Sequence, residues 1–208
     1  WKINKPVYNA MIENKELFLS TDPIKDNDAK ELKRRSKMVE WAFISEKARK
    51  LSKLEAFYQY LDVDYRGRFY YCESFMNFQG SDLARGLFKF QHSKPMTESG
   101  LQWLAIHTAS VFNMSYNIDE IPEWCTSDYK EHLEGEGLDN ISVDKMTLED
   151  RIIWTNEYMN DIIEAGKNSQ FSGQAEKKVS FLAACVEWYE FDCAYRDNRI
   201  HMTSLPIP

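Results

Sequence analysis

Apolar side chains recur every three or four residues along most of this chain, which is the spacing of one face of an α-helix. Residues 1–19 show this spacing at Ile3, Val7 and Met11, and Pro6 fits only the first turn of such a helix. The same spacing predicts further helices over residues 30–61 (one long helix or two), 83–91, 97–113, 144–166 and 174–191.

The pattern changes over residues 62–80, where aromatic and extended side chains are interrupted by Gly67 and Gly80. This favours short strands joined by turns. Residues 20–29 read as a polar loop, and Gly166 is predicted to end a helix, because glycine is common just past a helix C-terminus. The last residues, HMTSLPIP, begin like a strand that the prolines then stop. The chain is therefore predicted to be mostly α with a small β element, an α+β fold.

The chain has 208 residues, of which 43% are hydrophobic, and this is enough for one or two domains with an apolar core. The four cysteines form no C-x-x-C pair, and a chain of this size does not need disulfides, so reduced thiols and a cytoplasmic location are expected. No apolar run approaches the roughly 18 residues that a membrane helix requires. Because the chain begins at Trp1 and not at Met, we expect it to be the ordered or processed part of something longer.

The net charge of −7 argues at first against a nucleic-acid binder, because phosphate contacts need a basic surface. The charge is unevenly distributed, however. Residues 116–164 carry 14 acidic and 3 basic side chains, whereas residues 1–70 carry 11 acidic and 15 basic ones. Residues 116–143, the acidic insert, contain Pro122 and two glycines without clear periodicity. We expect the insert to be a solvated excursion or a short-helix insert that points away from any bound nucleic acid.

The densest chemical signal is the run DYRGRFY at residues 64–70. Arg66 and Arg68 flank Gly67, so guanidinium groups and backbone can approach a phosphate closely. Asp64 is placed to orient one of these arginines. The spacing alone does not separate this interpretation from an ordinary hairpin turn that exposes two arginines.

A second basic feature lies in residues 30–53, which hold nine basic and three acidic side chains. Lys47, Arg49 and Lys50 would let a helix face follow a nucleic-acid backbone, although such a charge run is also typical of a solvated helix face. The four histidines are scattered, and the chain has no P-loop, no G-x-G-x-x-G and no G-x-S-x-G motif. No self-contained active site is visible in the sequence.

Two short motifs in a fixed order change this picture. Asp64–Arg68, followed by Asn77–Asp82, resembles the D-[aromatic]-R-G-R … N-x-Q-G-x-D signature of single-subunit RNA polymerases, the T-odd phage and mitochondrial enzymes. The similarity extends over nearly the whole chain, except about 114–143. Further similar segments are Trp1–Asn4, Lys47–Lys50, Arg85–Leu87, Trp103–His107, Asp144–Lys145, Phe181–Glu187 and Ser204–Ile207.

The resemblance implies a place in the family's fold. Residues 1–61 would be the helical, basic, thumb-like end of the N-terminal region. Residues 62–208 would form the first part of the palm, with the insert at about 114–143.

The resemblance also implies roles for individual residues. Arg66 and Arg68 would contact the template or the RNA–DNA hybrid, with Gly67 allowing close approach. Lys145 would contact the triphosphate of the incoming nucleotide, a point-charge role suited to lysine. The other residues that the resemblance assigns to the nucleic-acid surface are Tyr70, Asn77, Gln79, Gly80, Lys47, Arg49 and Lys50.

One departure from the family pattern concerns catalysis. In the family, the S-L-P segment is followed almost at once by the first catalytic aspartate, whereas this chain stops at Pro208. The resemblance therefore leaves two readings: the sequence is a piece of a longer polymerase chain, or the polymerase is naturally split and a second subunit, with palm and fingers, holds the Mg²⁺ ions and the catalytic aspartates. We expect the second. The chain would be the smaller, N-terminal subunit of a split phage enzyme of the coliphage N-four type. It would be inactive alone and would act with DNA template, RNA product and NTPs in the cytoplasm of an infected bacterium, without membrane contact.

Two other functions fit parts of the sequence. The first is a nucleic-acid-binding accessory factor that shares the polymerase motif without joining an active site. The second is a helical interaction protein whose acidic insert makes the functional contact.

Overall fold

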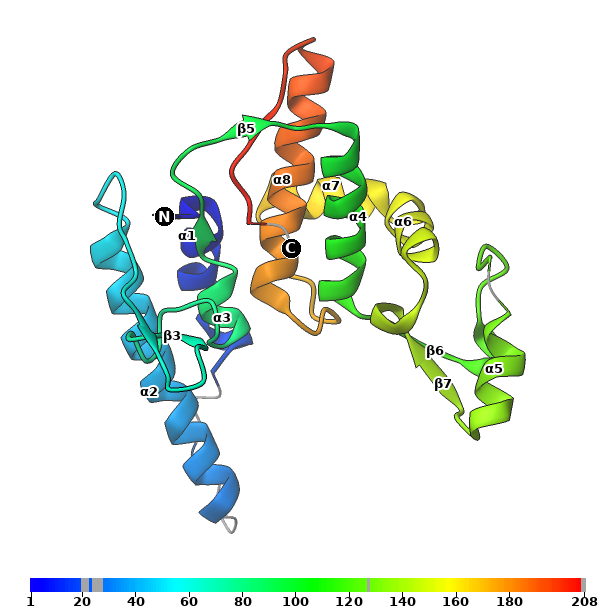
Figure 1. The fold of residues 1–208 in the computed structure, drawn as a ribbon, viewed down its shortest axis with the longest axis horizontal. Helices are drawn as coiled ribbons and strands as arrows, with labels where there is room; N and C mark the ends of the chain where they lie inside the picture. Colours follow the sequence, from blue (N-terminus) through cyan, green and yellow to red (C-terminus); the bar gives the residue numbers. More distant parts are fainter. Residues whose placement is uncertain (20–22, 24–27, 127, 207–208) are drawn as a thin grey trace. The chain divides into compact units, whose positions relative to one another are not determined.

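The structure is a computed structural model, which describes residues 1–19, 23, 28–126 and 128–206 (Figure 1). Helices dominate, and the strands pair in small two-stranded antiparallel sheets, so the expected α+β fold is confirmed. The chain divides into two compact units, unit 1 (Trp1–His92) and unit 2 (Ser93–Pro208). Most of the polar loop predicted over residues 20–29 lies outside the described residues, as does Ile207.

Unit 1 is built on one long helix, α2, which packs on shorter elements. Its elements are β1 (Lys2–Ile3), α1 (Lys5–Glu13), the 3-10 helix η1 (Lys15–Leu17), α2 (Asp28–Leu51), β2 (Leu61–Val63), β3 (Phe69–Tyr71), α3 (Asp82–Arg85) and β4 (Phe88–Lys89). β1 pairs with β4, and β2 pairs with β3. The core gathers apolar side chains from α1, α2 and the segments before and within β4: Val7, Met11, Ile44, Ala48, Met76, Leu87 and Phe88.

Two helices of unit 1 are shorter than the apolar spacing predicted. The helix expected over residues 30–61 ends at Leu51, because Phe57 exchanges backbone hydrogen bonds with Trp1. The Phe57 amide donates to the Trp1 carbonyl (2.9 Å), and the Trp1 amino group donates to the Phe57 carbonyl (2.8 Å). The helix expected over 83–91 is only the single turn α3, since Phe88 pairs with Ile3 across the β1–β4 sheet. Tertiary pairing overrides helical spacing at both places.

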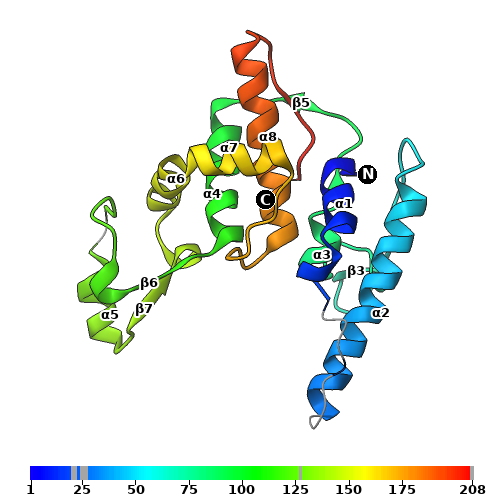
Figure 2. The same cartoon turned by 180° about the vertical axis from the view of Figure 1, so that it is seen from behind.

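Unit 2 is a helical assembly in which α4 runs beside α8 and α7 lies across α8 (Figures 1 and 2). Its elements are β5 (Lys94–Pro95), α4 (Glu98–Phe112), β6 (Ser115–Asn117), η2 (Ile118–Glu120), α5 (Tyr129–Glu136), β7 (Asn140–Ser142), η3 (Val143–Lys145), α6 (Leu148–Glu157), α7 (Met159–Asn168), α8 (Lys178–Arg196) and β8 (Met202–Thr203). The predicted helices near 97–113 and 174–191 are confirmed, and the predicted C-terminal strand is β8. None of the described helices combines the length and apolar character needed to cross a membrane.

Gly166 lies inside α7 and does not end it, so the predicted helix stop is wrong. α7 continues to Asn168, and Ser169 adopts the left-handed conformation (φ 49°) that follows the helix. Gly166 is buried against α8, where a Cβ placed on it would lie 2.0 Å from the carbonyl oxygen of Cys185. Close contact between two helices therefore requires this glycine.

The acidic insert is a strand pair that carries one helix, so the short-helix alternative is confirmed. β6 and β7 pair with Ser115 opposite Ser142, and α5 follows β6 at the far end of this ribbon (Figure 1). Asp150 of α6 anchors the insert, because its fully buried carboxylate accepts hydrogen bonds from the Thr126 amide (2.7 Å) and the Tyr129 hydroxyl (2.5 Å). Burial raises the pKa of Asp150, but these hydrogen bonds outweigh it and lower the pKa below its usual value.

Candidate nucleic-acid interface

The two arginines of the DYRGR motif lie in a tight turn between β2 and β3. Residues 61–71, the arginine hairpin, pair with Val63 opposite Phe69, and the Asp64 amide donates to the Arg68 carbonyl (2.9 Å) at the end of the ladder. Gly67 has a φ of 78°, a left-handed conformation that glycine adopts without strain. The glycine thus closes the turn and leaves no side chain between the two arginines.

Asp64 organises this turn from within. One of its carboxylate oxygens accepts the amides of Arg66 (2.8 Å) and Arg68 (3.0 Å), and the other accepts Arg68 Nε (2.8 Å) and pairs with its Nη2 (2.7 Å). These bonds, led by the one from the Arg68 amide, hold the pKa of Asp64 below its usual value. The expectation that Asp64 orients one arginine is therefore confirmed, and that arginine is Arg68.

Arg66 and Arg68 both project into solvent beside aromatic rings. The Arg66 guanidinium lies 5.2 Å from the Tyr65 ring centre, and the Arg68 guanidinium lies 5.6 Å from the ring centre of Tyr70. Cation–π contacts of this kind restrict a guanidinium without using its N–H donors, although Asp64 already engages Nε and Nη2 of Arg68. The arginine hairpin therefore presents two partly ordered cations within three residues of each other.

Exposed aromatic side chains around the hairpin were absent from the residues expected at the site. Tyr58 is 89% exposed, Tyr60 84%, Tyr65 88% and Phe69 62%. Flat rings this exposed can stack on unpaired bases, and such stacking tolerates any sequence. The aromatic residue inside the DYRGR motif, Tyr65, was the available signal, because it adjoins Arg66, an arginine expected at the nucleic-acid surface.

Asn77, Gln79 and Gly80 lie in the segment after β3, and one of them bonds to the hairpin. Gln79 Nε2 donates to the Phe69 carbonyl (3.1 Å), so the side chain bonds to β3. Asn77 is buried, and its Nδ2 donates to the Glu73 carbonyl (2.5 Å). A Cβ on Gly80 would lie 3.2 Å from two backbone carbonyl oxygens. Gln79 therefore ties this segment to the hairpin, whereas Asn77 and Gly80 order the segment itself. Direct contact with nucleic acid at these positions stays a prediction.

The three residues of α2 that were expected to contact nucleic acid, Lys47, Arg49 and Lys50, are exposed but paired with acids. Lys47 bridges to Glu73 (2.9 Å), which ties α2 to the segment after β3. Arg49 and Lys50 both pair with Glu46, at 2.7 and 3.4 Å, and the hydrogen bond from Arg49 is the main cause that lowers the pKa of Glu46 to about 2. The positive potential of this helix end is therefore partly neutralised, although exposed ion pairs are weak and exchange readily for phosphate.

Lys145 lies in unit 2 at the end of η3, apart in the chain from the arginine hairpin. Its side chain is 72% exposed and lies 3.4 Å from Asp144. Arg151 of α6 fixes the backbone on both sides, because its Nη2 donates to the carbonyls of Asp144 (2.7 Å) and Met146 (2.9 Å). An exposed ammonium group thus stands on a backbone segment that is held in place.

Comparison with known proteins identifies the family. A family model described as DNA-dependent RNA polymerase matches residues 94–208. The chain is 32% identical over 149 residues to DNA-directed RNA polymerase 1, mitochondrial, of Arabidopsis thaliana, and this match covers 70% of the chain and 12% of that protein. It is 28% identical over 166 residues to DNA-directed RNA polymerase 3B, chloroplastic, of Nicotiana tabacum, covering 77% of the chain and 14% of that protein.

These matches define a class, the template-directed polymerases of nucleic acid. Within it, the chain belongs to the single-subunit DNA-dependent RNA polymerase family. The chain spans about an eighth of the length of these relatives. The family model covers unit 2 from Lys94 onward, including Lys145 and the S-L-P segment.

Proposed function

We propose that this chain forms part of a DNA-directed RNA polymerase, in which the arginine hairpin contacts the template strand or the RNA–DNA hybrid. The observation that carries the proposal is the turn itself, where one carboxylate orders Arg68 and the backbone of Arg66. Guanidinium groups bind phosphate through their N–H donors, so the two arginines suit adjacent phosphates of one strand. Arg68 would use the donors that Asp64 does not engage, or would exchange Asp64 for phosphate. The exposed tyrosines beside them add faces on which bases can stack.

We further propose that Lys145 contacts the triphosphate of the incoming NTP. Its support is the combination of an exposed ammonium group with a backbone that Arg151 holds from both sides. Lys47, Arg49 and Lys50 would add contacts to nucleic-acid backbone, after exchange of their present acidic partners.

The catalytic Mg²⁺ ions belong, in this proposal, to residues outside this chain. The sequence contains no Asp-Gly pair of the kind that follows the family's S-L-P segment. Among the described residues, the group suited to a metal is Glu187, Glu190 and His201, which is not a pair of aspartates. A second chain with palm and fingers, as in a split phage enzyme, would supply the metal ligands and so the phosphoryl-transfer chemistry.

A mixing experiment tests the proposal. The chain and a candidate palm–fingers partner from the same source are purified separately and assayed for templated RNA synthesis. Neither alone should extend RNA, and the mixture should. A partner that is fully active without this chain would instead indicate an accessory factor, and a chain that extends RNA alone would refute the assignment of Mg²⁺ to a partner.

Lys145→Ala should raise the apparent KM for NTP about ten-fold and change kcat less, because it removes one charge-assisted contact to the triphosphate. Steady-state elongation kinetics of the assembled enzyme measure both constants. Lys130→Ala is the matched control, since Lys130 is also an exposed lysine of unit 2 paired with an aspartate (Asp119, 3.5 Å). An unchanged KM in the Lys145 variant would remove this residue from the site.

The acidic insert favours one competing function, an interaction with a basic protein, because it projects on a strand pair and carries most of the acidic excess. In that case, deletion of residues 116–143 would abolish function, and reversal of charge at Arg66 and Arg68 would be silent. The proposed function predicts the opposite: charge reversal at Arg66 and Arg68 should abolish function, and deletion of residues 116–143 should have the smaller effect.

A further inference from the structure

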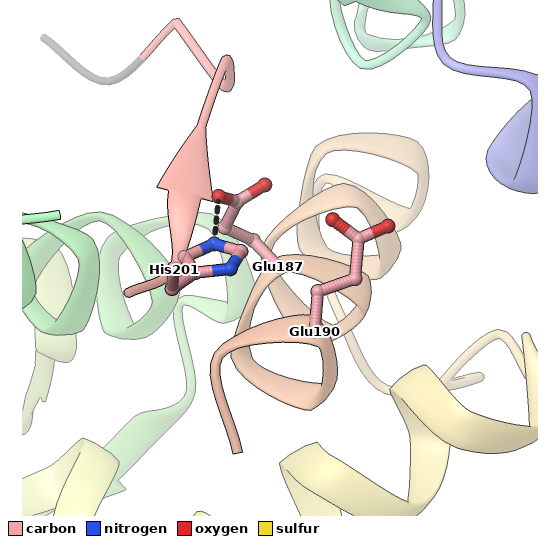
Figure 3. Close-up of side chains that lie close together, drawn as sticks. All are labelled: Glu187, Glu190 and His201. Atoms are coloured by element: carbon pink, nitrogen blue, oxygen red, sulfur yellow. Dashed lines mark hydrogen bonds and ion pairs between the residues drawn. The ribbon is translucent and has the colours of Figure 1, made fainter. Parts of the chain in front are cut away.

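Two glutamates and a histidine come together where α8 meets the segment before β8. Glu187 and Glu190 stand one helical turn apart on α8, so they share a face. His201 comes from beyond the end of the helix, and Figure 3 shows its imidazole beside both carboxylates. One ligand atom from each residue lies within 4.8 Å of the other two, and His201 Nε2 lies 2.7 Å from Glu187 Oε1.

The three side chains are buried or half-buried. Glu187 is 1% exposed and His201 9% exposed, and Glu190 is half-buried. The His201 carbonyl accepts the Met96 amide (2.9 Å), as β8 pairs with β5. The Phe191 ring meets the imidazole edge-on, at 6.0 Å between centres. The His201 backbone is therefore held by a hydrogen bond and its imidazole by the Phe191 ring. Surrounding contacts set the orientation of metal-binding histidines in the same way.

Electrostatics favour a cation at this place. Two carboxylates a few ångströms apart repel each other, and burial of one of them removes the water that would screen the repulsion. A protonated His201 offsets one negative charge. A dication offsets both, and it uses the imidazole as a neutral ligand in place of a proton donor.

The donor set selects the kind of ion. Two carboxylate oxygens and one imidazole nitrogen suit Zn²⁺ and similar transition metals, whereas Mg²⁺ prefers oxygen ligands alone. At bond lengths near 2.1 Å, ligand atoms around a tetrahedral Zn²⁺ lie about 3.4 Å apart. One separation is 2.7 Å and the others are no more than 4.8 Å, so side-chain rotations could bring the three ligand atoms to this spacing and leave one position for water.

We propose that Glu187, Glu190 and His201 bind a Zn²⁺-type transition-metal ion. The bound ion would join α8 to the segment that leads through β8 into Ser204 and Leu205. Its role is structural, and it is separate from the Mg²⁺ of nucleotidyl transfer, so the ion would bind whether or not the chain acts in transcription.

Thermal unfolding of the purified full-length protein, stripped with chelator and titrated with Zn²⁺, tests this site without nucleic acid. The midpoint should rise by about 5 °C or more at saturating Zn²⁺, because an ion that binds only the folded state stabilises it. Glu190→Gln should abolish the rise. This variant keeps the size of the side chain and leaves the His201–Glu187 hydrogen bond in place, so it should still fold.

His201→Asn should also abolish the rise, and His132→Asn is its matched control. His132 is an exposed histidine that also faces a glutamate (Glu136, 3.7 Å), so it reports Zn²⁺ bound at a surface pair. Loss of the rise in the two site variants and its retention in His132→Asn support the site. An equal rise in all variants, no rise in the parent protein, or an equal rise with Mg²⁺ would overturn it.

Discussion

Arg68→Ala should reduce the elongation rate of the assembled polymerase by about 10- to 100-fold. The variant removes a guanidinium that would bind a phosphate of the template or hybrid, and hydrogen bonds to charged groups contribute about 1.5–3 kcal/mol. The turn should survive, because the Arg68 amide, which the substitution keeps, donates to Asp64 and its carbonyl accepts the Asp64 amide. Single-turnover extension on a preformed RNA–DNA scaffold measures the rate.

A loss of elongation could also come from failed assembly, so association with the partner is measured on the same samples and should be unchanged. Arg196→Ala supplies the matched control. Arg196 is an exposed arginine of α8 that also pairs with an aspartate four residues before it (Asp192, 2.6 Å), and its loss should leave elongation near the parent rate. Normal elongation by Arg68→Ala would exclude the arginine hairpin from the interface.

Gly166→Ala should destabilise unit 2 by about 3 kcal/mol or more. The added methyl group would lie 2.0 Å from the Cys185 carbonyl oxygen and 3.0 Å from the Cβ of Tyr189, so α7 and α8 must move apart. Overpacking of this kind usually costs about 1–3 kcal/mol, and here the obstacle is backbone, which yields less than a side chain. Urea denaturation monitored by circular dichroism measures the change.

Gly135→Ala separates this clash from the general effect of replacing a helical glycine. Gly135 lies within α5, and a Cβ there has no atom within 4 Å. Alanine should therefore stabilise α5 by about 0.5–1 kcal/mol, since it loses less backbone freedom on folding. Opposite signs at the two glycines are expected, and equal effects would show that the contact between α7 and α8 is not tight.

The helices that the sequence predicted well are those whose apolar spacing is satisfied by packing along the whole element. α4 and α8 lie close to their expected ranges. The prediction failed where a distant residue supplied another partner. Trp1 forms backbone hydrogen bonds with Phe57, and Ile3 pairs with Phe88 across two strands. No periodicity within 83–91 can show a strand partner 85 residues earlier in the chain.

The candidate site also combines contacts between neighbours in the sequence, which could be predicted, with contacts between distant residues, which could not. Asp64, Arg66 and Arg68 lie within five residues, so the sequence indicated that the carboxylate could orient one of the arginines, and the structure shows that it is Arg68. The contacts of Gln79 with β3 and of Lys47 with Glu73 form only because the chain folds back on itself. The spacing of residues along the sequence does not show where this happens. The meeting of Glu187 with His201 is of this second kind, since it needs the end of α8 to double back.

Removal of the acidic insert has a consequence that its charge does not suggest. Ser115 and Ser142 face each other across the strand pair, so a two-residue turn could replace everything beyond them without a change in the path of unit 2. Asp150, however, would then lose its hydrogen bonds from Thr126 and Tyr129, which lie in the removed segment, and would keep its contacts with Thr147. A derivative without the insert should therefore lose stability at the start of α6, because the acid at position 150 links the insert to that helix.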